Sequence, residues 1–207
     1  STSVTIFLDN MGNATLTPAQ VNNGSSDNCT AFGDLDLGLS QTAFDCDDVG
    51  PNVVTLTVTD DCGNAAMCTS TVTVVDDVDP IAICQDITVE LDGMGNATID
   101  EDEVNDGSSD ACGGLTFDTD LTMFACADIA NNPIIVTLTV TDANNNMATC
   151  TAEVTVADNV APVATCQDIT VQLDGMGTAT IAENAVNNGS TDACGGLTFD
   201  TDITAFT

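Results

Sequence analysis

The sequence contains no lysine, arginine or histidine, and no tryptophan or tyrosine, among its 207 residues. It contains 33 aspartate and glutamate residues instead, so its formal net charge is −33 at pH 7. General acid–base catalysis usually relies on His, Lys, Tyr or tuned carboxylates, and only carboxylates remain here. These carboxylates recur in turns and hinges and gather at no singular site. The sequence therefore predicts that the protein is not an enzyme.

The absence of basic residues also restricts the partners. A polyanion repels nucleic acid and anionic membrane surfaces, and its self-repulsion opposes compaction unless salt or cations screen it. We therefore expect no nucleic-acid partner. The sequence has no apolar run long enough for direct membrane insertion. Its 43% content of hydrophobic residues argues against a disordered acidic chain.

Internal repetition organises the chain. Residues 84–124 and 166–206 are identical at 32 of 41 positions, with an offset of 82 residues. Self-similarity at a fixed period is the signature of a repeat architecture. We expect two complete units, residues 1–78 and 79–160, followed by the first half of a third, residues 161–207. The sequence is thus interpreted as a window on a longer chain.

Alternating apolar and polar residues predict short β-strands within each unit. In Val54–Thr59, valine and leucine alternate with threonine, which is the pattern of a half-buried strand. Strands are also expected at Thr2–Leu8 and Ala14–Leu16, with a tight turn between them, and Thr17–Val21 is expected to form a single helical turn. Many short strands without a long helix predict a β-sandwich of about seven strands per unit.

Ten cysteines at regular positions predict disulfides and therefore an oxidising compartment. Zinc sites usually use closely spaced cysteine pairs or histidine, whereas the spacings here are long and histidine is absent. The first unit has Ser1 where the second has Cys84, and it has Cys62 where the second has Asn144. These differences favour a replacement pair across a hairpin in the first unit.

The predicted pairs are Cys29–Cys46, Cys62–Cys68, Cys84–Cys150 and Cys112–Cys126. Cys166 and Cys194 would then find partners beyond residue 207. The main rival scheme joins neighbouring units instead, through Cys68–Cys84 and Cys150–Cys166, and would link the array along its length.

The hinges between units carry the candidate metal ligands. Acidic residues precede Pro80 and Pro162, and Ca²⁺ takes six to eight oxygen ligands from carboxylates, amide carbonyls and the backbone. The predicted ligands are Asp60, Asp76, Asp77, Asp79, Asp142, Asp158 and Asn159. The alternative is a solvated acidic hinge that proline stiffens without any metal.

Three loops rich in Asn, Asp and Ser recur at residues 22–28, 105–110 and 187–192. No strict EF-hand or RTX spacing is present, so they are interpreted as ordinary turns. Five asparagines fit the Asn-X-Ser/Thr pattern of glycosylation, a pattern that is common by chance in such a composition. They are Asn13, Asn23, Asn28, Asn96 and Asn188.

The phrases TVTDxxxNxAxC and TVTVxDxxxPxxxC, followed by CQDITV, resemble the hyalin-repeat (HYR) type of immunoglobulin-like module. The resemblance is strongest to tandem copies in large surface proteins of Bacteroidota-like bacteria. It departs from the metazoan pattern because Cys84 and Cys166 are followed by glutamine and not by proline. It implies an all-β fold of tandem immunoglobulin-like β-sandwich domains arranged end to end, and an extracellular adhesive or structural role.

Together these observations predict an extracellular array that forms the shaft of a cell-surface fibre or filament, in which the chain associates with copies of itself. Near-identical units, disulfides and proline-containing hinges favour this interpretation. The alternative is an adhesin that binds glycans or surfaces directly. An adhesin would be expected to vary its loops between units, and these loops are nearly alike.

Overall fold

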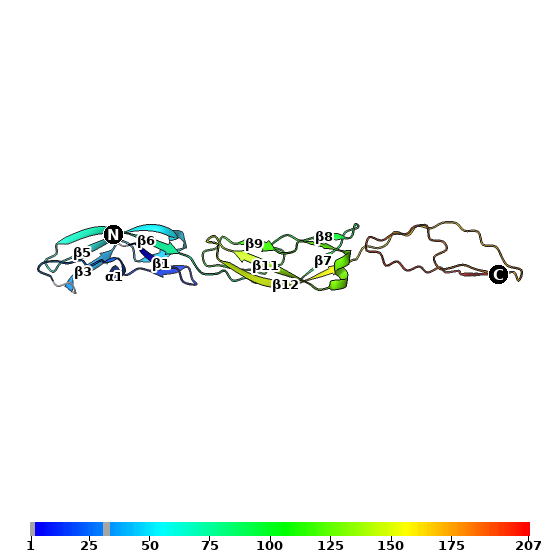
Figure 1. The fold of residues 1–207 in the computed structure, drawn as a ribbon, viewed down its shortest axis with the longest axis horizontal. Helices are drawn as coiled ribbons and strands as arrows, with labels where there is room; N and C mark the ends of the chain where they lie inside the picture. The colour runs from blue at the N-terminus through cyan, green and yellow to red at the C-terminus, as the bar shows by residue number, and fades with distance from the viewer. Residues whose placement is uncertain (1–2, 31–33) are drawn as a thin grey trace. The chain divides into compact units, whose positions relative to one another are not determined.

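The computed structural model describes residues 3–30 and 34–207 and confirms an all-β fold of immunoglobulin-like β-sandwiches. In the first repeat, four strands lie side by side in one sheet in the order β1-β6-β5-β3 (Figure 1). These strands are β1 (Val4–Phe7), β6 (Ala65–Val75), β5 (Gly50–Thr59) and β3 (Asp36–Leu39). Strand β1 runs parallel to β6, and the other two pairings are antiparallel. Thr2, where the first strand was predicted to begin, lies outside the described residues.

A second, smaller sheet completes the first sandwich. It pairs β2 (Asn13–Thr15) with β4 (Ala43–Asp45) in antiparallel fashion. The predicted helical turn is α1 (Pro18–Val21), with Thr17 as its N-cap. A 3-10 turn, η2 (Cys46–Asp48), follows β4. The two sheets enclose a core of small aliphatic side chains and one phenylalanine: Ile6, Leu8, Ala14, Leu16, Val21, Phe44, Val54, Leu56, Val72 and Val74.

The alternation read from the sequence determines which side chains enter this core. Val54 and Leu56 of β5 are buried, whereas Val53 lies on the opposite face and is 72% exposed. Successive side chains of a strand point to opposite faces of the sheet. The register of β5 against β6 therefore determines which of their side chains point into the core.

The second repeat has the same plan. One sheet has the order β7-β12-β11-β9, and the other pairs β8 with β10. These strands are β7 (Ile87–Glu90), β12 (Met147–Ala157), β11 (Ile134–Thr141), β9 (Thr116–Thr119), β8 (Asn96–Thr98) and β10 (Met123–Ala125), and a 3-10 helix, η3 (Cys126–Asn131), precedes β11. Among the described residues, each of the first two repeats thus contains six strands, close to the seven predicted.

Residues 161–207 contain only one short pair of strands, β13 (Ala179–Thr180) and β14 (Ala205–Phe206). In the second repeat, β7 pairs with β12. Leu173 is 52% exposed, whereas Leu91, the equivalent residue of the second repeat, is 4% exposed.

Five turns share one local design. An aspartate at the start of each turn accepts hydrogen bonds, through Oδ1, from the backbone N–H groups two and four residues later, and these aspartates are Asp9, Asp60, Asp92, Asp142 and Asp174. A short polar side chain that bonds its own backbone favours such a turn over continued strand.

The chain divides into two compact units that do not follow the sequence repeats. The first comprises residues 1–83, 106–118 and 139–150, and the second comprises residues 84–105, 119–138 and 151–207. Compactness and sequence repetition are different criteria, so the predicted domain limits of 1–78, 79–160 and 161–207 stay predictions. Within the described part of the chain, no helix is both long and apolar enough to span a membrane.

Candidate functional site: the disulfide-linked junctions

Two disulfides connect successive sequence repeats at equivalent positions. Cys46 of the first repeat bonds Cys112 of the second, with 5.2 Å between their Cα atoms. Cys126 of the second repeat bonds Cys194 of the third, with 5.1 Å between their Cα atoms. The first bond lies inside the first compact unit and the second inside the second unit. We call these two places the first and second junctions.

A glycine turn lies against each disulfide. Cys46 Sγ is 3.9 Å from the carbonyl oxygen of Gly12, and Cys126 Sγ is 3.6 Å from that of Gly95. These are contacts and not hydrogen bonds, because a disulfide sulfur carries no proton. A Cβ atom on Gly12 would lie 2.6 Å from Cys46 Sγ, and one on Gly95 would lie 2.4 Å from Cys126 Sγ. The turns can approach the disulfides only because both residues are glycine.

An aspartate two residues before the second cysteine shapes each junction loop. Asp110 Oδ1 accepts hydrogen bonds from the N–H groups of Cys112 and Gly113, at 2.7 and 3.2 Å. Asp192 does the same for Cys194 and Gly195, at 2.9 and 3.1 Å. The loops recognised in the sequence as ordinary turns thus hold the junction cysteines in position.

The same loops also hold the hinge segments that precede them. In the first junction, Ile81 and Ser109 exchange backbone hydrogen bonds of 2.7 and 2.9 Å. In the second, Val163 and Thr191 exchange bonds of 2.8 and 3.0 Å. Each hinge is therefore an extended segment tied to a loop and not a free linker.

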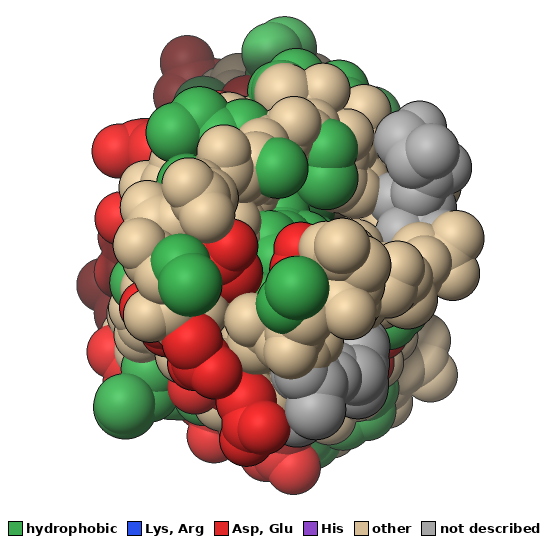
Figure 2. All heavy atoms as spheres, turned by 90° about the vertical axis from the view of Figure 1, so that its left-hand side faces the viewer, with side chains coloured by type: hydrophobic (Ala, Val, Ile, Leu, Met, Phe, Trp, Pro, Cys, Tyr) green, Lys and Arg blue, Asp and Glu red, His purple; other side chains and the backbone are tan. Residues whose placement is uncertain are grey.

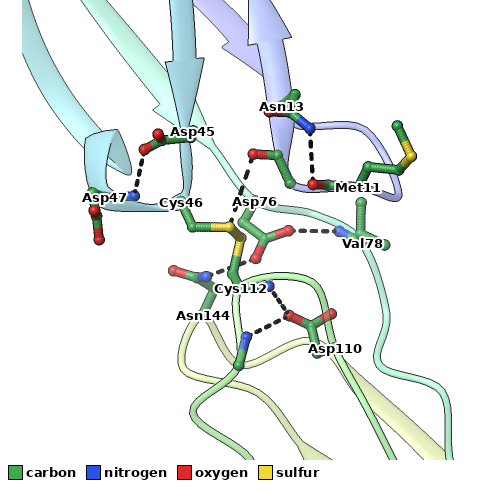
Figure 3. Close-up of a disulfide and its surroundings, with 12 residues drawn as sticks. Met11, Asn13, Asp45, Cys46, Asp47, Asp76, Val78, Asp110, Cys112 and Asn144 are labelled. Atoms are coloured by element: carbon green, nitrogen blue, oxygen red, sulfur yellow. Dashed lines mark hydrogen bonds between the residues drawn. A yellow bond between two sulfur atoms is a disulfide. The ribbon is translucent and has the colours of Figure 1, made fainter.

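Asp76 is the buried polar residue at the centre of the first junction (Figure 3). Its side chain accepts hydrogen bonds from the Asn144 side chain at 2.9 Å and from the Val78 N–H at 3.2 Å, and its backbone carbonyl accepts one from the Asn146 side chain at 3.2 Å. Asp142, itself buried, starts the turn that presents both asparagines. A carboxylate that is only 6% exposed requires such partners.

Each junction brings two carboxylates to the side of its disulfide. Ligand atoms of Asp76, Asp110 and Cys112 lie within 4.8 Å of one another, as do those of Asp158, Asp192 and Cys194. The sulfur atoms are committed to disulfides and provide no thiolate, which leaves two carboxylates per junction. Hard cations such as Ca²⁺ prefer oxygen ligands, so the donor atoms fit Ca²⁺ or a similar cation and do not fit zinc.

The other predicted ligands are not members of these two groups. Asp77 and Asp79 are exposed, and Asp79 lines a surface hollow of about 310 Å³ together with Asp110. Asp60 binds the Asn64 side chain within its own turn, at 2.8 Å, and Asn159 donates to Glu90 at 3.1 Å. Sequence reasoning missed Asp110 and Asp192, although their fixed position two residues before a repeated cysteine was a visible signal.

The structure overturns three of the four predicted disulfides, two of which involve junction cysteines. Cys46 bonds Cys112 and not Cys29, and Cys126 bonds Cys194 and not Cys112. Within the first sandwich, Cys46 lies just before β5 begins. Thr30, the neighbour of Cys29, accepts a hydrogen bond from the N–H of Asp61, which lies just after β5 ends. A ten-residue strand spans about 33 Å, so Cys29 and Cys46 lie at opposite ends of the sandwich. The expectation that Cys194 finds its partner beyond residue 207 is also wrong.

Four cysteines of the described chain carry free, exposed thiols: Cys29, Cys62, Cys68 and Cys166. The Cys62–Cys68 prediction is therefore wrong. Cys68 lies opposite Leu56, three residues inside the hairpin end and thus roughly 10 Å along the strand, whereas disulfide Cα atoms are usually less than about 7 Å apart. The rival pairs Cys68–Cys84 and Cys150–Cys166 fail as well, although that scheme was right to link repeats.

Cys84 and Cys150 are both disulfide-bonded, and the predicted bond between them stays a prediction. Cys29 occupies the position of Cys112 and Cys194 in the first repeat. Its loop has the same geometry, because Asp27 accepts hydrogen bonds from the N–H groups of Cys29 and Thr30 at 2.8 and 2.9 Å. These bonds, chiefly the one from Cys29, lower the pKa of Asp27.

The five glycosylation candidates divide into two groups. The amide nitrogens of Asn13 and Asn96 donate to the carbonyls of Met11 and Met94, within the turns beside the junctions. The other three, Asn23, Asn28 and Asn188, are exposed in the junction loops or their first-repeat equivalent. Glycosylation itself stays a prediction.

The charge at the surface has one sign only. Figure 2 shows aspartate and glutamate side chains among apolar and uncharged groups, with no basic side chain between them. Because the sequence contains no Lys, Arg or His, the carboxylates at the junctions have no cationic side chain with which to pair.

No family model matches the sequence, and no curated protein matches it. Solved structures that are similar to the chain include extracellular domains of protocadherins. They are protocadherin gammaB4 (17% identity, TM-score 0.37, 81% of this chain and 34% of that one), human protocadherin-24 EC1-2 (12%, 0.40, 76% and 95%) and human mucin-like protocadherin EC1-2 (13%, 0.33, 75% and 95%). This chain thus spans about a third of the protocadherin gammaB4 structure. The fold assignment rests on the sheets described above.

Proposed function

We propose that this chain is a structural segment of an extracellular fibre, part of the shaft of a cell-surface filament. The observation that carries the proposal is the repetition of one covalent junction, Cys46–Cys112 and Cys126–Cys194, between successive repeats. A disulfide that connects successive sequence repeats fixes these parts of the chain to one another, which is what a shaft requires. Disulfides of this kind also persist in oxidising compartments outside the cytosol.

The sequence supports the same role. The junction loops keep their spacing in all three repeats, whereas a set of ligand sites would be expected to diversify. The phrases that resemble hyalin-repeat modules of bacterial surface proteins agree with an extracellular structural role. A directly binding adhesin is the alternative.

Immunogold labelling of intact source cells with antibodies against residues 1–207 tests the proposal. A shaft predicts gold along the length of surface fibres. Label restricted to the fibre tips would replace the shaft with the adhesin. Label found only inside permeabilised cells would refute both. Pre-incubation of the antibody with the purified chain provides the control for specificity.

We also propose that Ca²⁺ binds at both junctions. Asp76 and Asp110 would hold one ion and Asp158 and Asp192 the other, with the remaining oxygens supplied by backbone carbonyls or water. The ion would supply the positive charge that the side chains of this chain lack, and would draw the hinge carboxylate towards the loop carboxylate. The exposed Asp79 lies close enough to Asp110 to line the same hollow.

Isothermal titration with CaCl₂ tests this proposal. The wild-type chain is expected to bind two ions, and the Asp110→Asn and Asp192→Asn variants one each. The matched control is Asp36→Asn, which removes the same charge from an exposed position of β3 and should leave two sites. Unchanged stoichiometry in the junction variants would eliminate the sites.

Chains are further proposed to associate side by side with copies of themselves, with divalent cations bridging their acidic faces. Such bridges overcome a repulsion that the net charge of −33 otherwise imposes. In low salt, EDTA should reduce the sedimentation coefficient of native filaments. Filaments that sediment unchanged after chelation would show that cations do not hold the chains together.

A further inference from the structure

The junction disulfides define the route by which tension travels through the chain. Cys46–Cys112 closes a loop with a sequence separation of 66, and Cys126–Cys194 closes one with a separation of 68. Between the two disulfides the chain runs through residues 112–126 alone. We propose that the chain is a covalently shortened tether, in which the load passes from disulfide to disulfide and bypasses most of the backbone. This inference rests on the proposed function as a shaft.

The bypassed segments include both hinges and the hydrogen bonds that hold them. Both proline-containing hinges, residues 76–80 and 158–162, lie inside the closed loops. Hydrogen bonds such as Asn144 to Asp76, or the backbone pair of Ile81 and Ser109, can break under load. Their loss does not lengthen the tether, because the disulfides keep the ends of each loop 5.2 and 5.1 Å apart at Cα.

The hidden length is large compared with the junction itself. An extended backbone spans at most about 3.5 Å per residue, so each closed loop hides roughly 230 Å of chain. The load-bearing connector, residues 112–126, contains only β9, β10 and the turn between them. A chain with these bonds therefore resists extension even if both sandwiches unfold, whereas a fully reduced chain lengthens by both loops.

The remaining bonded cysteines do not alter this route. Cys84 lies within the first closed loop and Cys150 within the second. The predicted bond between them would run parallel to the connector and add a second path, so the connector would stay the shortest one. The free thiols Cys29, Cys62, Cys68 and Cys166 contribute no cross-link.

Reduction should convert the tether into an extensible chain. A dithiol reductant such as dithiothreitol donates two electrons and two protons to each disulfide, which gives two cysteine thiols, and is itself oxidised to a cyclic disulfide. Each loop is then released. The proposal requires that this change in length follows the redox state and not the folded state.

Single-molecule force extension of residues 1–207, held through enzymatically attached peptide tags at both ends, tests the inference. Reduction of all the disulfides should add roughly 470 Å to the contour length, also in strong denaturant, where folding plays no part. The double variant Cys126→Ser/Cys194→Ser should extend by roughly 200 Å more than wild type without reductant, even if Cys84 and Cys150 provide a parallel path. The control Cys62→Ser should match wild type.

An oxidised chain that reaches the contour length of the reduced chain would overturn the tether. The extension curve also separates this inference from the proposed function. A short oxidised contour together with gold label at fibre tips would leave the tether intact and refute the shaft. Label along the fibre with a long oxidised contour would leave the shaft intact and refute the tether.

Discussion

At the scale of single residues, the turn beside the first junction disulfide fits there because Gly12 has no side chain. Gly12 has φ +72° and would place a Cβ atom 2.6 Å from Cys46 Sγ. The variant Gly12→Ala therefore combines left-handed backbone strain with a clash against a disulfide that cannot rotate away. We expect it to lower the free energy of unfolding by about 2 kcal/mol or more, as measured by denaturant unfolding.

Gly24 provides the matched control for this prediction. It has φ +78° and no heavy atom within 4 Å of the Cβ position, so Gly24→Ala retains the backbone strain and removes the clash. We expect a loss of about 1 kcal/mol. Equal losses in the two variants would mean that the turn can move away from the disulfide.

The cysteines allow a second prediction at this scale. Iodoacetamide applied to the native chain should alkylate Cys29, Cys62, Cys68 and Cys166, which carry exposed free thiols. Six cysteines should react only after reduction, because a disulfide sulfur is not a nucleophile: Cys46, Cys84, Cys112, Cys126, Cys150 and Cys194. Peptide mass spectrometry reads out both sets. Alkylation of Cys46 or Cys194 before reduction would contradict the junction disulfides.

Disulfide connectivity could not be predicted from the sequence because the repeat makes the choices equivalent. Cys46 has Cys29 behind it and Cys112 ahead of it, and these two cysteines occupy the same position of successive repeats. Only the length of β5, which separates the ends of the sandwich, distinguishes the two partners. Spacing along the chain carries no information about that distance until the strands are placed.

At the scale of elements, strands and turns were predictable because their determinants are local. The alternation in Val54–Thr59 identified β5, which extends further back, to Gly50. Pro18 identified α1. The acidic pairs Asp76–Asp110 and Asp158–Asp192 were harder to predict, because each combines a hinge residue with a loop residue 34 positions further along the chain. Nothing in the local sequence indicates that these segments meet.

The turns that begin with aspartate give a pH dependence of known sign. Hydrogen bonds from the backbone, chiefly from Asn96, lower the pKa of Asp92, and equivalent backbone bonds, chiefly from Thr178, lower that of Asp174. The pKa of Asp60 is lowered chiefly by the hydrogen bond from the Asn64 side chain and then by backbone bonds. A folded-state pKa below the unfolded value contributes stability that is present above the unfolded pKa of about 3.9 and is lost as the pH falls through the folded pKa. Acid should therefore weaken these turns.

The variant Asp92→Asn separates the stability that the ionised Asp92 carboxylate gives to its turn from the effect of the net charge of the chain. Asparagine retains an acceptor oxygen but does not titrate, so the variant should melt below wild type at pH 7, and the difference should shrink below about pH 4 as Asp92 becomes protonated. Calorimetry at pH 7 and pH 3 measures both. Asp36→Asn, which changes the charge equally on strand β3, should show no such convergence. A difference that is constant with pH would mean that the carboxylate charge does not stabilise the turn.

At the scale of the whole molecule, the net charge and the disulfides act against each other. With 33 carboxylates and no basic side chain, the folded chain gathers negative charge that the unfolded chain would spread out. Disulfides counter this by restricting the unfolded chain, and the effect grows with the size of the loop they close. Loops of 66 and 68 residues lie in the range where that restriction is substantial.

Salt should therefore stabilise the molecule in two separable ways. Raising NaCl from 0.01 to 0.15 M shortens the Debye length from about 30 to about 8 Å, which screens repulsion between carboxylates, so the melting temperature should rise for every variant alike. CaCl₂ at equal ionic strength should raise it further only where the junction carboxylates are intact, because binding to the folded state adds stability by mass action. The Asp110→Asn/Asp192→Asn double variant should lose this additional rise and retain the response to NaCl. If CaCl₂ and NaCl act equally on wild type, screening alone accounts for the effect, and the junctions rely on their disulfides and hydrogen bonds.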